Sequence, residues 1–358
     1  MPARVLIAGA GVAALEAALA LRSLAADRVD VELLGAEHHF WYRPLSVTEP
    51  FEPGVAMRYE LPALAVAAGA RFTPGTLLGV DAARHEATTS VGDIGYDFLL
   101  VAVGVLPSSA VAGAVTFRGP ADREKLESLL DDVVAGRARR IAFAIPEGEV
   151  WPLPLYELAL LTAAHVAQRR IKEVELTLAT SEVAPLQVFG DAASIEVRQL
   201  LRERGVSLLC GASALSFRDG VLRLHPEREL EADRVVAAPR LRGAWLEGLP
   251  QTRFGFIPID PFARVEGCDD VYAAGDIVDF PVKQGGIAAQ LADVAATSIA
   301  SLVGADVQAV PFEPVLEGLL LTGDPDRSLR FEPGGVLNFS AEQQGKIAGR
   351  HLAPFLTG

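Results

Sequence analysis

The chain has 358 residues, half of them hydrophobic, and a formal net charge of −14 at pH 7. This length and composition predict a globular protein of two or three domains and exclude an intrinsically disordered one. The negative charge argues against nucleic-acid binding, which needs a basic surface, and against strong binding to anionic lipid.

The two cysteines, Cys210 and Cys268, lie far apart in the sequence, and no CxxC pair is present. We therefore expect neither a redox-active short disulfide nor a metal site. Free thiols fit a reducing, cytoplasmic environment. No apolar run reaches the roughly 20 residues that a transmembrane helix needs.

The first pattern with chemical meaning opens the chain. Residues 4–8 form a short apolar run, GAGVAA follows at residues 9–14, and an alanine-rich segment continues to about residue 24. This is the GxGxxA form of the dinucleotide-binding fingerprint in its required context of strand, tight turn and helix. Gly9 permits the turn, Gly11 lets the backbone approach a pyrophosphate, and Ala14 lets the helix pack on the strand. The start of the helix then attracts the anion.

The acidic residue of this fingerprint normally stands at the end of the second strand, about 20 residues past the glycines, and binds the ribose. The second predicted strand, residues 29–34, ends at Gly35 instead, and Glu37 follows two residues later. Two interpretations of Glu37 are open. It is either a carboxylate that reaches the ribose from the loop or a solvated loop charge.

Two later segments share one design, a buried strand that ends in small residues. They are YDFLLVAVG at residues 96–104 and VYAAGD at residues 271–276, and a predicted helix follows the second at about residues 284–302. With GAGVAA, they resemble the three FAD motifs of the pyridine nucleotide-disulfide oxidoreductase superfamily, in the same order. The resemblance is nearest to the branch that holds type II NADH dehydrogenases and sulfide:quinone oxidoreductases.

This resemblance implies that the chain binds FAD. It makes Asp276 the ligand of the ribitol chain, where the alternative is a helix N-cap, and it places Ala102 and Gly104 beside the middle of the cofactor. The implied FAD-binding residues are Gly9, Gly11, Ala14, Glu37, Arg43, Pro44, Leu77, Ala102, Gly104, Gly275, Asp276, Gln284, Gly285 and Ile287.

The resemblance also implies where three of these segments lie. The loop FWYRPL at residues 40–45 runs beside the flavin, and the backbone of Leu77 meets the adenine. The predicted helix that starts at residues 283–287 points its N-terminus at the flavin pyrimidine edge. Lys283 and that N-terminus would there stabilise the negative charge of reduction. The alternative for Lys283 is a surface charge, as lysines are usually exposed.

The middle of the chain has the layout of a second, nicotinamide-binding Rossmann domain, but its phosphate loop is atypical. Residues 145–157 read IPEGEVWPLPLYE and contain no GxGxxG. Prolines remove N–H donors, and two glutamates repel a pyrophosphate. The next predicted strand, residues 174–179, is followed by Thr180 and Ser181, with no acid for a ribose. We expect the fold to be kept and the NAD(P)H site to be degraded.

The same loop resembles that of sulfide:quinone oxidoreductases and flavocytochrome sulfide dehydrogenases, because PLYE at residues 154–157 is similar to their GPAYE. Those enzymes place a reactive cysteine six residues before the glutamate, where this chain has Trp151. Sulfide chemistry is therefore not expected. Trp151 is either an aromatic wall over the flavin or a core aromatic. The resemblance puts the Glu157 carboxylate near the flavin, and the alternative is a surface ion-pair partner within a helix.

The predicted fold is α/β, with two Rossmann-like domains and a small C-terminal segment. We expect a discontinuous FAD domain at residues 1–118 and 243–310, an inserted NAD(P)-binding-like domain at residues 119–242, and a C-terminal segment at residues 311–358. In that segment residues 316–323 predict a strand and turn, and residues 345–352 a terminal helix. Membrane-bound relatives carry amphipathic helices at this end, so weak peripheral membrane contact stays open.

The predicted function is that of an FAD-dependent oxidoreductase with a small-molecule electron donor and a small-molecule acceptor. The sequence identifies neither, and a quinone is one candidate acceptor. Two alternatives are open: an NAD(P)H dehydrogenase with an atypical nucleotide loop, and a flavin-binding partner protein that does not turn over. The expected catalytic residues are Trp151, Glu157 and Lys283. The oligomeric state is not predicted.

Overall fold

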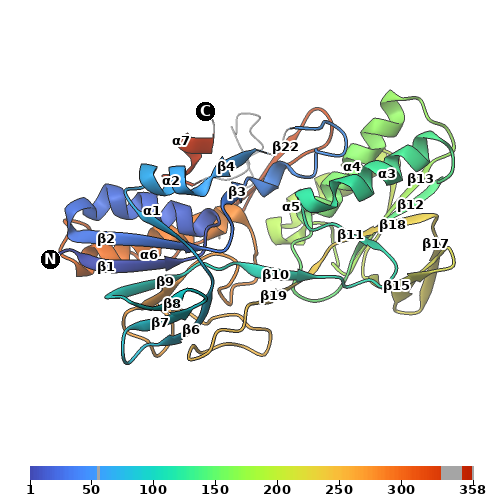
Figure 1. Cartoon of the computed structure of the whole chain (residues 1–358). Coiled ribbons are helices and arrows are strands. Elements are labelled where there is room, and N and C mark those ends of the chain that lie inside the picture. The colour runs from blue at the N-terminus through green and yellow to red at the C-terminus, as the bar shows by residue number, and fades with distance from the viewer. Residues whose placement is uncertain (55–56, 332–348, 357–358) are drawn as a thin grey trace.

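The computed structural model describes residues 1–54, 57–331 and 349–356. Two five-stranded parallel sheets form the two halves of the molecule (Figure 1). The first sheet has the order β20-β9-β1-β2-β5. Its strands are β1 (Ala3–Ala8), β2 (Val29–Gly35), β5 (Arg71–Pro74), β9 (Phe98–Val101) and β20 (Val271–Ala273).

Two long helices, α1 (Val12–Ala25) and α6 (Gly285–Leu302), pack against each other beside the first sheet. Alanines dominate the buried residues of both helices, so the two backbones can approach closely. β1 is apolar on both faces, as a central parallel strand must be, because helices or loops cover it on each side. The strand, turn and helix expected at the start of the chain are confirmed.

The second sheet has the order β11-β18-β12-β13-β14 and is also parallel. Its strands are β11 (Val115–Thr116), β12 (Arg140–Ile145), β13 (Glu175–Thr180), β14 (Val206–Leu209) and β18 (Arg234–Ala237). The helices of this half are α3 (Arg123–Val134), α4 (Leu153–Gln168) and α5 (Asp191–Glu203). The expected α/β fold with two Rossmann-like halves is confirmed.

One antiparallel strand pair joins the two halves. β10 (Val105–Ser108) leaves the first half and pairs with β19 (Arg240–Gly243), which returns from the second (Figure 1). β11 already belongs to the second sheet although it precedes residue 119. The domain limits given above stay a prediction.

Small antiparallel sheets and short helices complete the fold. The expected hairpin near residues 214–224 is present, with a third strand added. The remaining elements are β3 (His39–Trp41), β4 (Arg58–Glu60), β6 (Leu77–Asp81), β7 (Glu86–Thr89), β8 (Gly92–Gly95), β15 (Ser213–Arg218), β16 (Val221–His225), β17 (Arg228–Glu231), β21 (Leu316–Leu320), β22 (Arg327–Phe331), α2 (Leu61–Ala67) and α7 (Ala353–Leu356).

The C-terminal segment agrees only in part with expectation. The strand predicted from residue 316 is confirmed as β21. Of the helix predicted at residues 345–352, residues 345–348 lie outside the described part of the chain, and residues 350–352 form a turn that precedes the four-residue α7. Among the described residues, none of the helices combines the length and apolarity that crossing a bilayer requires.

Candidate functional site

A cleft of about 720 Å³ lies between the two halves. Its walls are built from the segments that follow the strands of both parallel sheets, where ligands of open α/β sheets usually bind. All site residues predicted from the sequence line this cleft except Ala14 and Ile287, which are buried in α1 and α6. Their grouping supports one shared binding site and leaves the role of each residue a prediction.

The turn after β1 has the geometry that the fingerprint requires. Gly9 has a φ of +135°, and a Cβ atom there would lie 2.1 Å from the carbonyl oxygen of Ala102. Gly11 is the N-cap of α1, and a Cβ atom there would meet nothing within 4 Å. Gly11 therefore opens toward free space at a helix N-terminus, and the pyrophosphate of a dinucleotide fits these residues.

Asp276 lies in the turn after β20 and lines the cleft. Within the described chain, its carboxylate has no hydrogen-bond donor, although Lys283 and Arg43 act on it electrostatically. Burial raises the pKa of Asp276, and the positive charges of Lys283 and Arg43 lower it by a smaller amount. No helix starts at Asp276, so the N-cap alternative is wrong. A carboxylate without a donor, directed at a cleft, suits the hydroxyl groups of a ribitol chain.

Lys283 is buried in the floor of the cleft and is 4% exposed. Its Nζ atom donates to the carbonyl oxygen of Val278 and lies 3.8 Å from the centre of the Phe256 ring. Burial lowers the pKa of Lys283 to about 8, although nearby carboxylates, Asp276 first, oppose that effect. The surface-charge alternative for Lys283 is therefore wrong.

The start of α6 is capped by the side chain of Gln284. Its Oε1 atom accepts the N–H of Ile287 at 3.1 Å, and its Nε2 atom donates to the carbonyl oxygen of Glu317 at 2.8 Å. The Ile287 N–H is thus already used, so Ile287 contributes packing. Gln284 and Gly285 line the cleft directly.

Glu157 and Trp151 bring the second half to the same cleft. Glu157 in α4 is 1% exposed, and its Oε1 atom accepts the N–H of Leu321 at 3.0 Å. The surface-pair alternative for Glu157 is therefore wrong. Trp151 is half-buried, lines the cleft and packs on Phe189 with 6.1 Å between ring centres. Its position in the cleft wall is compatible with an aromatic wall over the flavin, and that role stays a prediction.

Residues 158–298 match the family described as pyridine nucleotide-disulphide oxidoreductase. This match covers less than half of the chain, so it shows a similarity to that family in the second half of the fold and in part of the first. No curated protein sequence matches the chain.

Solved structures show the same fold. The sulfide:quinone oxidoreductase of Aquifex aeolicus is 17% identical, with a TM-score of 0.86, and the alignment covers 95% of this chain and 87% of that one. A ferredoxin reductase from Rhodopseudomonas palustris is 20% identical, with a TM-score of 0.69 and coverage of 91% and 81%. A water-forming NADH oxidase from Lactobacillus brevis is 16% identical, with a TM-score of 0.68 and coverage of 91% and 74%.

In this chain, the loop after β12 is hydrogen-bonded to its own half of the protein. The N–H of Glu147 donates to Ser213 Oγ at 2.9 Å, and the carbonyl oxygen of Glu149 accepts the N–H of Leu241 at 2.8 Å. At the start of α4, Pro154 has no N–H, and the N–H of Leu155 donates to the carbonyl oxygen of Pro152. The N–H groups of Glu147 and Leu155 are thus engaged within the protein, and Pro152 and Pro154 have none to offer a pyrophosphate.

One acid near the end of β13 was missed in the sequence. Glu182 follows that strand by two residues, close to where a ribose-binding acid of the superfamily is expected. Its Oε2 atom instead accepts the hydroxyl groups of Tyr156, at 2.7 Å, and Thr180, at 2.9 Å. Burial raises the pKa of Glu182. Its position two residues after β13 is the one sequence feature that suggests a ribose-binding acid. In the structure its carboxylate is instead engaged with Tyr156 and Thr180 inside the protein.

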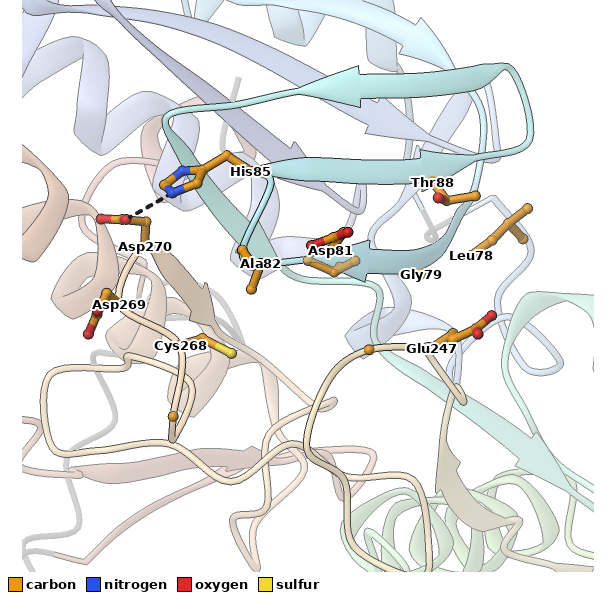
Figure 2. A pocket seen from close by; sticks show the side chains of 14 residues that line it. Leu78, Gly79, Asp81, Ala82, His85, Thr88, Glu247, Cys268, Asp269 and Asp270 are labelled. Atoms are coloured by element: carbon orange, nitrogen blue, oxygen red, sulfur yellow. Dashed lines mark ion pairs between the residues drawn. The ribbon is translucent and has the colours of Figure 1, made fainter.

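Neither cysteine lines the cleft. Cys210 is half-buried beside Arg198. Cys268 borders a different hollow of about 950 Å³, which Figure 2 shows together with the His85–Asp270 ion pair. Burial raises the pKa of the Cys268 thiol, which keeps it protonated at neutral pH. None of the predicted site residues borders this hollow.

Proposed function

We propose that the chain holds one non-covalent FAD in the cleft and passes electrons from a small-molecule donor other than NAD(P)H to a small-molecule acceptor. The observation that carries this proposal is the meeting of the Gly9–Gly11 turn, Asp276 and Lys283 in one cleft. These groups suit a pyrophosphate, a ribitol chain and an electron-rich ring. FAD supplies the reversible uptake of two electrons.

The residues of the chain divide the remaining tasks. The N-terminus of α1 at Gly11 holds the diphosphate, and Asp276 orients the ribitol hydroxyl groups. Lys283 keeps a positive charge in a site with little water, where it opposes negative charge that arrives with the electrons. Because its pKa is about 8, the Nζ atom also exchanges a proton near neutral pH. Trp151 excludes water from the wall of the cleft that the second half of the molecule forms.

The loop after β12 supports a donor other than NAD(P)H. Its glutamates and prolines, together with the inward-turned Glu182, remove the usual contacts for both the pyrophosphate and the ribose of a second dinucleotide. The wall near Trp151 is mainly apolar and includes Phe117, Leu153, Leu155, Leu241 and Leu319. Such a wall suits a flat apolar acceptor, and a quinone is the candidate that we favour.

The absorption spectrum of the purified protein tests this proposal. We expect a yellow protein with one FAD per chain that can be extracted by denaturation. Asp276→Ala should lose most of the flavin, whereas Asp269→Ala, in the other hollow, should keep it. A wild-type protein that stays colourless after incubation with FAD would refute the proposal.

Electron-transfer assays separate the alternatives. Reduction of artificial acceptors by the photoreduced flavoprotein is expected for the enzyme. A stable flavoprotein that reduces no acceptor would instead support the non-catalytic partner protein. Rapid reduction by NADH would support the NAD(P)H dehydrogenase.

A further inference from the structure

Three side chains that are typical metal ligands meet outside the cleft. Glu16 belongs to α1, Asp293 to α6, and His351 to the segment of residues 349–356 (Figure 1 shows α7 at its end). One ligand atom from each lies within 4.8 Å of the others. The Nε2 atom of His351 lies 3.8 Å from Asp293 Oδ1. The cluster thus joins three parts of the chain that are far apart in sequence.

The burial of Glu16 needs an explanation, because a glutamate is almost never fully buried without a charged partner. Glu16 is 0% exposed. Its Oε1 atom accepts the N–H of His351, and its Oε2 atom accepts the N–H of Leu352, each at 2.7 Å. A carboxylate oxygen has two lone pairs, so each oxygen keeps one for a further ligand.

Asp293 adds a second, independent observation. Its Oδ1 atom is shielded from solvent and has no hydrogen-bond partner among the described residues. This atom faces His351 and belongs to a carboxylate beside that of Glu16. Glu16 is fully buried and Asp293 is 26% exposed, so water screens the repulsion between the two carboxylates only in part, and either a bound cation or a shared proton relieves it. Arg350 acts on Asp293 electrostatically, but its side chain is exposed, outside the cluster.

The distance between the ligand atoms of His351 and Asp293 suits a metal ion. Zinc binds histidine nitrogen and carboxylate oxygen at about 2.0–2.2 Å, so two ligands in a tetrahedral arrangement lie about 3.4 Å apart. The separation of 3.8 Å between His351 and Asp293 is within a few tenths of that value. One imidazole and two carboxylates are a ligand set that zinc and manganese accept.

We propose that Glu16, Asp293 and His351 bind one divalent transition-metal ion, of the zinc or manganese class. The ion fastens the segment of residues 349–356 to α1 and α6, the two helices whose N-termini border the cleft. Other contacts already dock this segment: Leu352 is buried, and the Tyr59 hydroxyl donates to the carbonyl oxygen of Leu356 at 3.1 Å. A Cβ atom at Gly349 would lie 2.7 Å from Glu16 Oε2, so a larger residue there would displace the Glu16 carboxylate.

Isothermal titration calorimetry tests this site, with Zn²⁺ added to the full-length protein after treatment with a chelator. We expect one ion per chain, and visible absorption bands when Co²⁺ replaces Zn²⁺. His351→Ala should weaken Zn²⁺ binding at least tenfold, and Asp293→Asn should do the same. His85→Ala is the matched control, since it removes the histidine of another His–Asp pair, at 3.6 Å, and should leave the affinity unchanged.

A structural readout accompanies the affinity. Zn²⁺ should slow amide hydrogen exchange of residues 349–356 in the wild type and leave it unaltered in His351→Ala. His351 is partly exposed, so this variant should fold even if Asp293→Asn does not. Absence of Zn²⁺ binding at millimolar concentration, or equal binding by His351→Ala and His85→Ala, would overturn the proposal and indicate that the two carboxylates share a proton.

Discussion

Replacing Lys283 with Met should stabilise the flavin-free protein at neutral pH. The lysine is buried, and its pKa falls from 10.5 to about 8 in the folded protein. That lowering corresponds to about 3 kcal/mol at about 1.4 kcal/mol per pH unit. Folding therefore carries this cost whenever the amine is protonated in both the folded and the unfolded protein. A Met side chain, of similar length but uncharged, removes the cost.

The pH dependence follows from the direction of this pKa change. Below pH 8 both states bind the proton and the full cost applies. Between about pH 8 and 10.5 only the unfolded chain keeps the proton, so the stability of the wild type rises toward that of Lys283→Met. Above that range the difference is lost.

Urea unfolding of both proteins between pH 7 and 10.5 measures this difference. Lys172→Met, at an exposed lysine, is the control and should follow the wild type at every pH. A Lys283→Met protein that is less stable than the wild type at pH 7, or a difference that does not change with pH, would show that the lysine is not held as a costly buried charge.

Three further predictions concern the cleft and the two cysteines outside it. In anaerobic stopped flow, millimolar NADH should bleach the flavin slowly, since each carboxylate close to the pyrophosphate of NADH weakens its binding by about 1–4 kcal/mol. Trp151→Ala should accelerate the bleaching, whereas the control Trp245→Ala should not. Bleaching of the wild-type flavin at about tens per second would contradict this prediction. Gly9→Ala should fail to fold or lose its flavin because of the 2.1 Å clash, whereas Gly11→Ala should fold and bind FAD weakly, as circular dichroism and absorbance would show. Replacement of both cysteines with Ser should leave flavin reduction by dithionite and its reoxidation unchanged, and a large loss of electron transfer in the folded variant would refute this.

The parts of the cleft that could be predicted from sequence are those encoded by short local patterns. The turn from Gly9 to Ala14 depends on steric limits within a few residues, and because only small residues satisfy those limits, the turn can be recognised in the sequence. The strand and turn that carry Asp276 are equally local. Because strands of a parallel sheet end at one edge, the order of these motifs was enough to bring them to one cleft.

What the sequence did not reveal depends on distant partners. Lys283 was open to interpretation as a surface charge because nothing near it shows that Phe256, 27 residues earlier, covers its amine. Glu182 could be recognised as engaged only once Tyr156 was placed beside it. Glu16 looked like an ordinary charge in an alanine-rich helix, because the segment that buries it is more than 300 residues away.

The paired strands β10 and β19 make the second half of the molecule separable by engineering. Ser108 and Arg240 are cross-strand partners, so the entry and exit of the intervening 109–239 segment are neighbours in one antiparallel ladder. Partners in such a ladder lie about 4.5–5.5 Å apart, a gap that a two-residue turn of the Asn-Gly type closes. Replacement of residues 109–239 by such a turn would convert the crossover into an ordinary β-hairpin, and offers a route to a minimal flavin-binding protein that keeps one of the two parallel sheets.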